Sequence, residues 1–264
     1  MNPSWLSCMS SLSNYRKVIV FFFAVVLSMK GHATWSIVAV DPETGDVGYA
    51  VASCTFRVHG IAKAIPGKGA IVVQAKSNPK VRNKAFKLLG TESNATDILE
   101  ELSEEPDEPD LHQYGIAVFP GDQHTESQSL AHSGKDIPEW NGSLTERTFS
   151  IQGNTLVNEN VLSAAYDAFV EDGSLSLEER LMAALLAASK AGGDHRCGEQ
   201  TATSSAMAVY KKNDKPQHPF LSLAVYGLER DDAGLNAVEL MNAQFQKWKK
   251  ESKDRKSTQL FLIP

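Results

Sequence analysis

Alternation of side-chain character directly after residue 33 is the feature that most restricts the fold of this chain. Residues 34–40 alternate between two faces of an extended strand, one with Thr34, Ser36, Val38 and Val40 and the other with Trp35, Ile37 and Ala39. Residues 41–46 (DPETGD) have the composition of a turn. Alternation resumes over residues 47–54, where one face carries only Gly48, Ala50 and Ala52. The pattern predicts a half-buried β-hairpin whose second strand packs closely against another layer.

Later apolar segments predict further strands and helices. Strands are expected near residues 70–75, 114–119, 129–132, 148–152, 206–210 and 220–225. Helices are expected over residues 81–89, after an N-cap at Thr96, over 161–169, after a capping box of Ser176 and Glu179, and from about 233 to 250. No strand-helix-strand unit of about 30 residues repeats, so antiparallel sheets covered by helices are favoured over a parallel sheet. We expect one α+β domain over residues 34–264.

The first 33 residues have the composition of a secretory signal peptide. Basic residues precede an unbroken apolar run at residues 18–27, and the small Gly31 and Ala33 suit the subsites of a signal peptidase. The run is about half of the ~20 apolar residues that a membrane-spanning helix needs, so a permanent anchor is the weaker interpretation. Cleavage after Ala33 would leave residues 34–264 in the periplasm or outside the cell, with no membrane partner.

Charge and motif content exclude several classes of partner. The chain carries 26 basic and 32 acidic residues, a net charge of −6, and the signal segment contains basic residues but no acid, so the mature part is more acidic still. Such a chain repels phosphate backbones, and it has no arginine-rich stripe with interleaved aromatics, so no nucleic-acid partner is expected. The seven histidines form no HExxH-like set, and we expect no metal or other cofactor. A homo-oligomer is compatible with the sequence.

Two of the three cysteines would remain in the mature chain. Cys8 would leave with the signal peptide, and Cys54 and Cys197 would remain in an oxidising compartment. We expect a disulfide bond between them, provided that their Cα atoms come close enough. It would close a loop over most of the mature chain and stabilise the fold by about 2–4 kcal/mol. The alternative is that one of the two is a reactive thiol.

Cleavage after Ala33 would give Thr34 a free α-amine beside its own hydroxyl. An α-amino group has a pKa near 7.7–8.0 and is therefore partly neutral at physiological pH. It can accept the hydroxyl proton, directly or through water, and so create an activated nucleophile without a histidine. The alternative is an ordinary frayed amino terminus, because many secreted proteins begin with serine or threonine by accident.

Four sequence blocks resemble a known protein family. They are TWSIVAVDPETGDVGYAVAS at residues 34–53, QAKSNP at 74–79, QGN at 152–154 and AGGDHRCGEQTA at 191–202. Together they are similar to the DUF1028 proteins, a family placed in the Ntn-hydrolase (N-terminal nucleophile) superfamily. The resemblance covers nearly the whole mature chain and implies a four-layer αββα sandwich, with two antiparallel sheets between helical layers. It also implies that Thr34 matches the family's leading threonine.

Two departures from the usual family pattern bear on the site. Cys197 is inserted before Gly198 in the block that usually reads GGDxRGxQSA, and Lys76 replaces the tryptophan of TQAWANP. Together with Cys54, the insertion suggests a secreted branch that adds a bridge near the site. Lys76 would change the shape and charge of the pocket, so the substrate is not transferred from relatives.

Residue types and the resemblance together suggest roles at the site. Thr34 would be the nucleophile, and Asn154 would donate its side-chain amide to a developing oxyanion. Asp194 would orient the α-ammonium, and Arg196 would bind a substrate carboxylate in bidentate fashion. The alternative is an Asp194–Arg196 ion pair that only fastens their loop. Substrate contacts are also expected from four further residues, Ser53, Gln74, Asn78 and Lys76, although the first three stand at strand ends, where polar side chains often satisfy backbone groups.

Two functions from different classes fit these features. The first is an extracytoplasmic amidohydrolase that attacks an amide or related acyl bond of a small molecule or peptide through a Thr34 acyl-enzyme. Arg196 and Lys76 would favour an anionic substrate. The second is a non-catalytic module that binds a cell-envelope ligand in the same cleft.

The exported protein is expected to begin at Thr34. Mass spectrometry of the intact mature chain should give the mass of residues 34–264. A mature chain that begins at any other residue would lack the amine on which the nucleophile depends.

Overall fold

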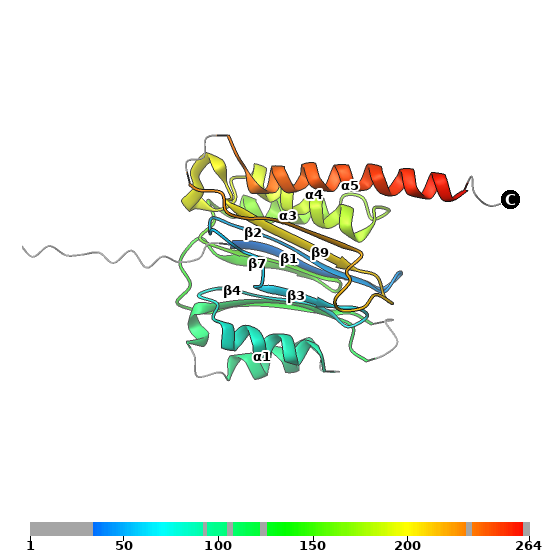
Figure 1. The fold of residues 1–264 in the computed structure, drawn as a ribbon. Helices are drawn as coiled ribbons and strands as arrows, with labels where there is room; N and C mark the ends of the chain where they lie inside the picture. The colour runs from blue at the N-terminus through cyan, green and yellow to red at the C-terminus, as the bar shows by residue number, and fades with distance from the viewer. Residues whose placement is uncertain (1–33, 92–93, 105–107, 122–125, 231–233, 261–264) are drawn as a thin grey trace, which may run out of the picture. The chain divides into compact units, whose positions relative to one another are not determined.

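Two antiparallel β-sheets lie face to face in this computed structural model, which describes residues 34–91, 94–104, 108–121, 126–230 and 234–260, with side chains up to 252 (Figure 1). The larger sheet has the strand order β10 (Leu221–Val225), β9 (Ser204–Tyr210), β2 (Asp46–Ser53), β1 (Thr34–Asp41), β8 (Phe149–Asn154) and β7 (Gly142–Glu146). The smaller sheet has the order β3 (Ala62–Ile65), β4 (Gly69–Ala75), β5 (His112–Val118) and β6 (Gln128–Ser133).

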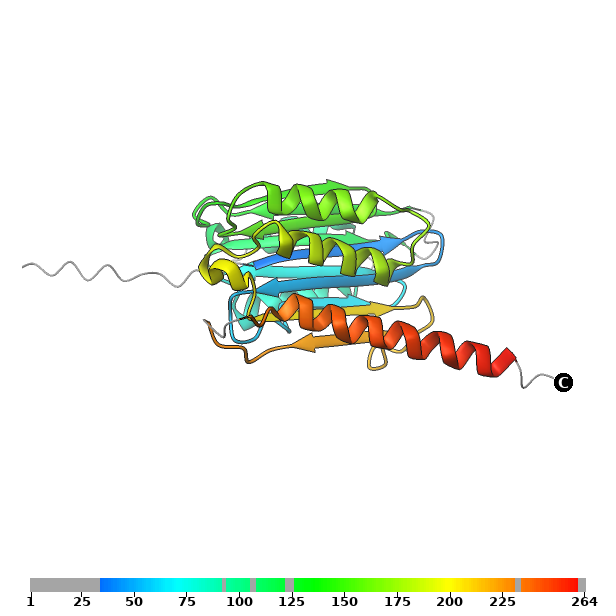
Figure 2. The same cartoon turned by 90° about the horizontal axis from the view of Figure 1, so that it is seen from above.

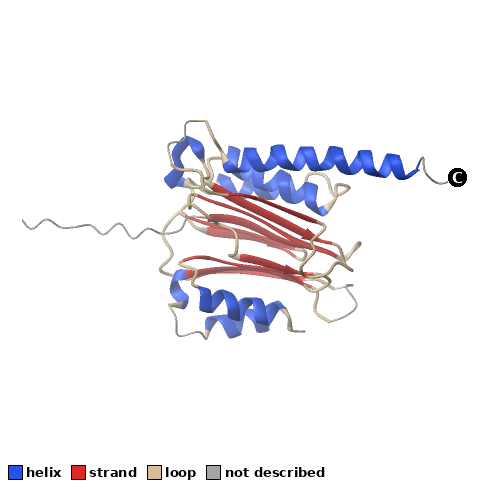
Figure 3. Ribbon diagram, viewed as in Figure 1, coloured by secondary structure: helices blue, strands red, loops and turns tan. Residues whose placement is uncertain are grey.

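Helices cover the outer face of each sheet, which makes a helix-sheet-sheet-helix order of layers (Figure 3). The larger sheet is covered by α3 (Asn160–Val170), α4 (Leu177–Lys190) and α5 (Ala237–Leu260), which lie side by side in Figure 2. The smaller sheet is covered by α1 (Pro79–Leu89) and α2 (Ala95–Ser103). The predicted α+β sandwich of two antiparallel sheets is therefore confirmed, whereas the predicted signal peptide lies outside the described residues.

The predicted hairpin is present. β1 and β2 pair from Thr34 opposite Ser53 to Asp41 opposite Asp46. The small-residue face of β2 lies under α4, where a Cβ added at Gly48 would stand only 2.9 Å from Cδ1 of Leu181. Close packing of a helix on the sheet thus explains why this face carries no large side chain.

Several predicted boundaries need correction. The N-cap of α2 is Asn94, not Thr96, because the Asn94 side chain accepts the backbone N–H of Asp97. The capping box of α4 is confirmed, since the Glu179 carboxylate accepts from both the backbone and the hydroxyl of Ser176. Two short strands, β3 and β7, carry too little apolar pattern to be predicted, and α5 begins at Ala237, four residues later than expected. None of the described helices combines the length and apolar character that a membrane span requires.

The layer between the two sheets changes from apolar to polar along the strands. Buried apolar side chains fill one part of it: Val38, Val40, Val47, Val51, Val72, Ala117 and Phe119. Toward the end where β1 begins, the inward-facing positions are buried and polar: Thr34, Ser36, Ser53, Gln74, Gln113, Gln152, Asn154 and Ser204. Buried polar groups are usually hydrogen-bonded, but Ser204 Oγ has no hydrogen-bond partner among the described residues. A concentration of buried polar side chains at strand ends is unusual for a core, so a site is sought at this end of the layer.

The predicted disulfide between Cys54 and Cys197 is present, with the two Cα atoms 5.6 Å apart and a sequence separation of 143 residues. Cys54 directly follows β2, and Cys197 lies in the 3₁₀ segment η2 (His195–Gln200). The bond therefore joins the loop after α4 to the end of the hairpin.

Removal of this disulfide is expected to lower the free energy of unfolding by about 2–4 kcal/mol, because a large loop is no longer closed in the unfolded chain. Urea unfolding of the exported protein and of the Cys54→Ser/Cys197→Ser variant tests this. In a reducing buffer the two proteins should have the same midpoint. Equal midpoints under oxidising conditions would contradict the expectation.

Candidate active site

Four polar side chains form a row across the larger sheet at the start of β1. Thr34 pairs with Ser53 on one side and Asn154 on the other, and Ser53 pairs with Ser204. All four are nearly inaccessible, with Thr34 only 2% exposed. The Thr34 hydroxyl donates to Ser53 Oγ at 3.3 Å. Three of the predicted site residues, Thr34, Ser53 and Asn154, thus meet because strand register places them side by side.

Gln74 reaches this row from the opposite sheet. Its Oε1 accepts the Ser36 hydroxyl at 2.7 Å, and its Nε2 donates to the Thr34 carbonyl at 3.3 Å and to Gln113 Oε1 at 2.6 Å. The Gln74 amide is therefore hydrogen-bonded both to the backbone of Thr34 and to the side chain of Ser36. The predicted residue Gln74 belongs to the site through this support of Thr34, and it also lines a cavity there.

Gln113 on β5 is the hub of the hydrogen bonds between the sheets. Its Oε1 accepts from Asn154 Nδ2 at 3.1 Å as well as from Gln74, and its Nε2 donates to Ser133 Oγ at 2.8 Å and to the Gly153 carbonyl at 2.9 Å. Both ends of this amide are satisfied, which is the condition for burying it. Sequence reasoning missed Gln113, although a buried glutamine within an apolar strand is itself a signal.

Gln152, two residues before Asn154 on β8 and opposite Ser36, completes the network. Its Nε2 donates to Ser36 Oγ at 2.6 Å, and its Oε1 accepts from the Ser150 hydroxyl at 2.6 Å. The amide lies directly over Gly115, where an added Cβ would stand 2.1 Å from Gln152 Oε1. Gly115 is required here by space rather than by backbone conformation.

A small cavity opens beside Thr34. It has a volume of about 160 Å³ and is lined by nine residues: Thr34, Thr55, Arg57, Val58, Ile61, Gln74, Ala75, Ser77 and Arg82. The lining contains one predicted nucleophile, two guanidinium groups and no carboxylate. The two arginines were not predicted, because neither belongs to a motif and they come together only in the fold.

Asp194 and Arg196 form a close ion pair, as the alternative interpretation of their sequence allowed. Arg196 Nη2 lies 2.7 Å from Asp194 Oδ2, and the Asp194 carboxylate also accepts the backbone N–H groups of Arg196 and Cys54, the latter at 2.6 Å. Asp194 is fully buried. It therefore fastens the η2 loop to the residue that follows Ser53, and Arg196 is already engaged by a carboxylate.

Two other predicted residues flank the cavity lining without belonging to it, since Ala75 and Ser77 line the cavity and Lys76 and Asn78 do not. Lys76 pairs with Glu108 at 2.8 Å, and both side chains are largely exposed. Asn78 caps α1, its side-chain oxygen accepting the backbone N–H of Val81 at 3.0 Å. Neither lines the cavity of Thr34, so the structure assigns Asn78 a capping contact and Lys76 a surface ion pair.

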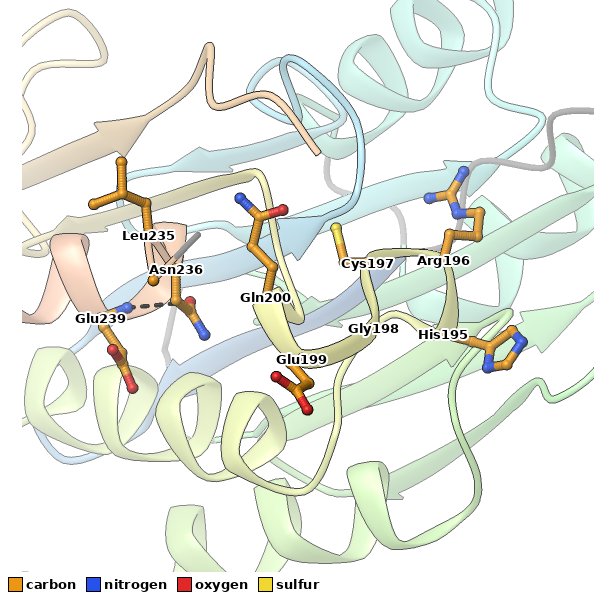
Figure 4. A pocket seen from close by; sticks show the side chains of 10 residues that line it. His195, Arg196, Cys197, Gly198, Glu199, Gln200, Leu235, Asn236 and Glu239 are labelled. Carbon is orange, nitrogen blue, oxygen red and sulfur yellow. Dashed lines mark hydrogen bonds between the residues drawn. The ribbon is translucent and has the colours of Figure 1, made fainter. Parts of the chain in front are cut away.

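A larger cavity of about 820 Å³ borders the η2 segment and the start of α5 (Figure 4). The figure shows His195 and Arg196 directed away from Asn236 and Glu239, so the polar groups do not converge on one point. Its lining residues include no serine or threonine, and Cys197 is bound in the disulfide. Among the described residues, no cluster of three histidine, cysteine, aspartate or glutamate side chains is placed to hold a metal ion.

Comparison with known proteins identifies the family of the chain. The family model DUF1028, described as a family of unknown function, matches residues 34–233, and the chain belongs to this family. The crystal structure of protein SPO2555 from Silicibacter pomeroyi, also assigned to DUF1028, is similar with a TM-score of 0.66 at 26% identity, covering 81% of this chain and 85% of the other. Anbu from Hyphomicrobium sp. strain MC1 matches at 12% identity and a TM-score of 0.44, covering 84% of this chain and 97% of the other. No curated protein matches significantly.

Replacement of the hub amide should destabilise the fold. In Gln113→Leu the donors of Gln74 and Asn154 and the Gly153 carbonyl lose their partner in a dry interior, so we expect a loss of about 3 kcal/mol or more in the free energy of unfolding. Gln246→Leu, an equivalent change on the exposed side of α5, should alter it by less than about 0.5 kcal/mol. Similar unfolding midpoints for the two variants would show that the network does not stabilise the sheets.

Proposed function

We propose that the protein is an extracytoplasmic amidohydrolase of the Ntn type, with Thr34 as its N-terminal nucleophile. The observation that carries the proposal is the position of Thr34: the first residue of a central strand, buried between the sheets, with its hydroxyl bonded to Ser53 and its side chain lining a cavity. The DUF1028 match begins at this same residue. The helix-sheet-sheet-helix order of layers agrees with the Ntn-hydrolase architecture that the family resemblance implies.

The chemistry needs only one residue to supply nucleophile and base. Oγ1 of Thr34 attacks the acyl carbon while its proton passes to the α-amine, directly or through water. The C–N bond then breaks, and the α-ammonium returns the proton to the departing amine, leaving an ester on Thr34. Water attacks that ester with the same amine as base, and the carboxylic acid leaves as Thr34 regains its hydroxyl proton.

Asn154 and Ser53 would assist these steps from the neighbouring strands. Ser53 Oγ accepts the Thr34 hydroxyl and so orients Oγ1. One N–H of the Asn154 amide is bound to Gln113, and the proposal assigns the other N–H to a developing oxyanion. Gln74, through the Thr34 carbonyl, is a positioning residue, and so is Asp194, through its bond to the backbone of Cys54.

Export would supply the free α-amine that the mechanism requires and a compartment in which the disulfide bond can form. Removal of the signal-like segment would free the α-amine, and an oxidising compartment permits the Cys54–Cys197 bond that fastens the η2 loop. These features support a periplasmic or secreted location for the working protein.

Labelling by a small acyl-transfer probe tests the nucleophile. The exported protein should be acylated on Thr34, and the rate should rise with pH through about 7.7–8.0 as the amine loses its proton. Thr34→Ala should reduce labelling at least a hundredfold, whereas Thr34→Ser should retain it.

Thr145→Ala is the control, because Thr145 lies exposed on the edge strand β7, outside the lining of the cavity, and has no α-amine. Labelling that survives Thr34→Ala, or that falls equally in Thr145→Ala, would contradict the proposal. Absence of labelling together with ligand-induced thermal stabilisation that survives Thr34→Ala would instead support the non-catalytic binding module.

A further inference from the structure

The cavity beside Thr34 brings together two positive charges from separate parts of the chain. Arg57 lies in the loop after β2, and Arg82 lies in the first turns of α1. Both line the cavity that Thr34 lines, and no aspartate or glutamate does so. In a protein with more acidic than basic residues, a lining whose charged side chains are all positive is not expected from average surface composition.

Neither guanidinium has an acidic partner within the part of the chain that the structure describes. Arg82 Nη1 donates to the carbonyl and the hydroxyl of Ser77, at 3.2 and 3.1 Å, and Arg57 Nε donates to His59. Arg196 and Lys76, which the sequence suggested as anion-binding groups, are instead paired with Asp194 and Glu108. Among the described residues that line this cavity, the cations are therefore Arg57 and Arg82.

Both arginines are held in place by neutral groups that leave donors open. The backbone and side chain of Ser77 fix Nη1 of Arg82, and no described residue accepts a hydrogen bond from its Nη2 or Nε. Burial, and then the charge of Arg57, lower the pKa of His59, so its imidazole is neutral near neutral pH and can accept from Arg57. The His59 ring is itself packed on Tyr226, with centroids 5.5 Å apart.

Partial burial of the Arg82 guanidinium without a nearby carboxylate is energetically unfavourable. Burial lowers the pKa of the Arg82 guanidinium from its usual value, which reflects the loss of hydration that no nearby carboxylate offsets. An anionic ligand in the cavity would offset it, because charge-assisted hydrogen bonds are roughly twice as strong as neutral ones.

We propose that Arg57 and Arg82 form a carboxylate-binding subsite in the Thr34 cavity, so that the protein takes small amides that carry a carboxylate near the amide bond. The planar guanidinium matches a carboxylate in bidentate geometry. The cavity, at about 160 Å³, is smaller than the roughly 300–1,000 Å³ of drug-sized pockets, so it accommodates the end of a ligand rather than a large one. Because Thr34 lines the same small space, the carboxylate and the acyl carbon would belong to one compact molecule or to one end of a peptide.

The choice of amide substrate rests on the proposed function, but the subsite is tested by binding alone. The test uses the exported Thr34→Ala protein, which holds no nucleophile, in an NMR titration with N-acetylglycine, N-acetyl-β-alanine and N-acetyl-γ-aminobutyrate. Their primary amides are the uncharged controls, and inorganic phosphate is the competing anion. At least one carboxylate should bind at least tenfold more tightly than its own amide and than phosphate.

Variants in the same background locate the subsite. Arg82→Gln and Arg57→Gln should each weaken binding of the preferred carboxylate at least tenfold, the loss expected for one charge-assisted hydrogen bond. Arg82→Lys, which keeps the charge but not the planar fork, should recover part of the affinity. Arg147→Gln removes the same charge from the exposed turn between β7 and β8, at the far end of β8 from Asn154, and should have no effect.

Two outcomes would overturn the subsite: equal affinity for carboxylates and their amides, or equal losses in Arg147→Gln and the two cavity variants. Preferential binding of phosphate would assign the arginines to a different anion. Thermal unfolding of each variant shows whether it has folded. If Arg82→Gln fails to fold, the carboxylate affinity of Arg57→Gln, a change at an exposed residue, still tests the subsite. Failure of acyl labelling with intact carboxylate binding would overturn the proposed hydrolase and leave the subsite standing.

Discussion

The hydrogen-bonded amides between the two sheets are the constraint on which the rest of the structure depends. Gln74 and Gln113 bind each other across the smaller sheet and bind the Thr34 carbonyl and the Asn154 amide across the larger one. Buried amides of this kind stabilise a fold only when every donor and acceptor is satisfied. The network thereby fixes the distance and register between the sheets at one end, and it is at this end that a cavity opens.

The remaining polar features converge on the same strand ends for separate reasons. Register places Ser53 and Asn154 beside Thr34, while the Asp194 carboxylate and the Cys54–Cys197 bond bring the η2 loop to the end of β2. α1 contributes Arg82 from the opposite sheet's outer layer. A rigid scaffold with reactive groups on strand ends is a common arrangement for positioning a site to within a fraction of an ångström.

Much of this arrangement was predictable from local pattern, and the rest was not. Alternation placed Thr34 and Ser36 on one face, and the composition of residues 41–46 predicted the turn. The pairing of Cys54 with Cys197 was predicted because they are the two cysteines left after residue 33 and because an oxidising compartment was expected. Arg57, Arg82 and Gln113 were missed because their significance arises from contacts between segments far apart in the chain. Lys76 and Asn78 stand in a recognisable block, yet strand and helix geometry direct one to the surface and the other to the end of α1.

The bond between Cys54 and Cys197 also ties the completion of the protein to its surroundings. In a reducing cytoplasm the two thiols would persist, and the segment from Asp194 to Gln200 would be held to the end of β2 only by weaker contacts such as the hydrogen bond to the Cys54 amide. If the protein is exported as proposed, the chain before export would differ from the mature protein in two independent ways: the amine of Thr34 would still be in a peptide bond, and the η2 loop would lack its disulfide. Under the proposed function, both differences would keep the activity low until export.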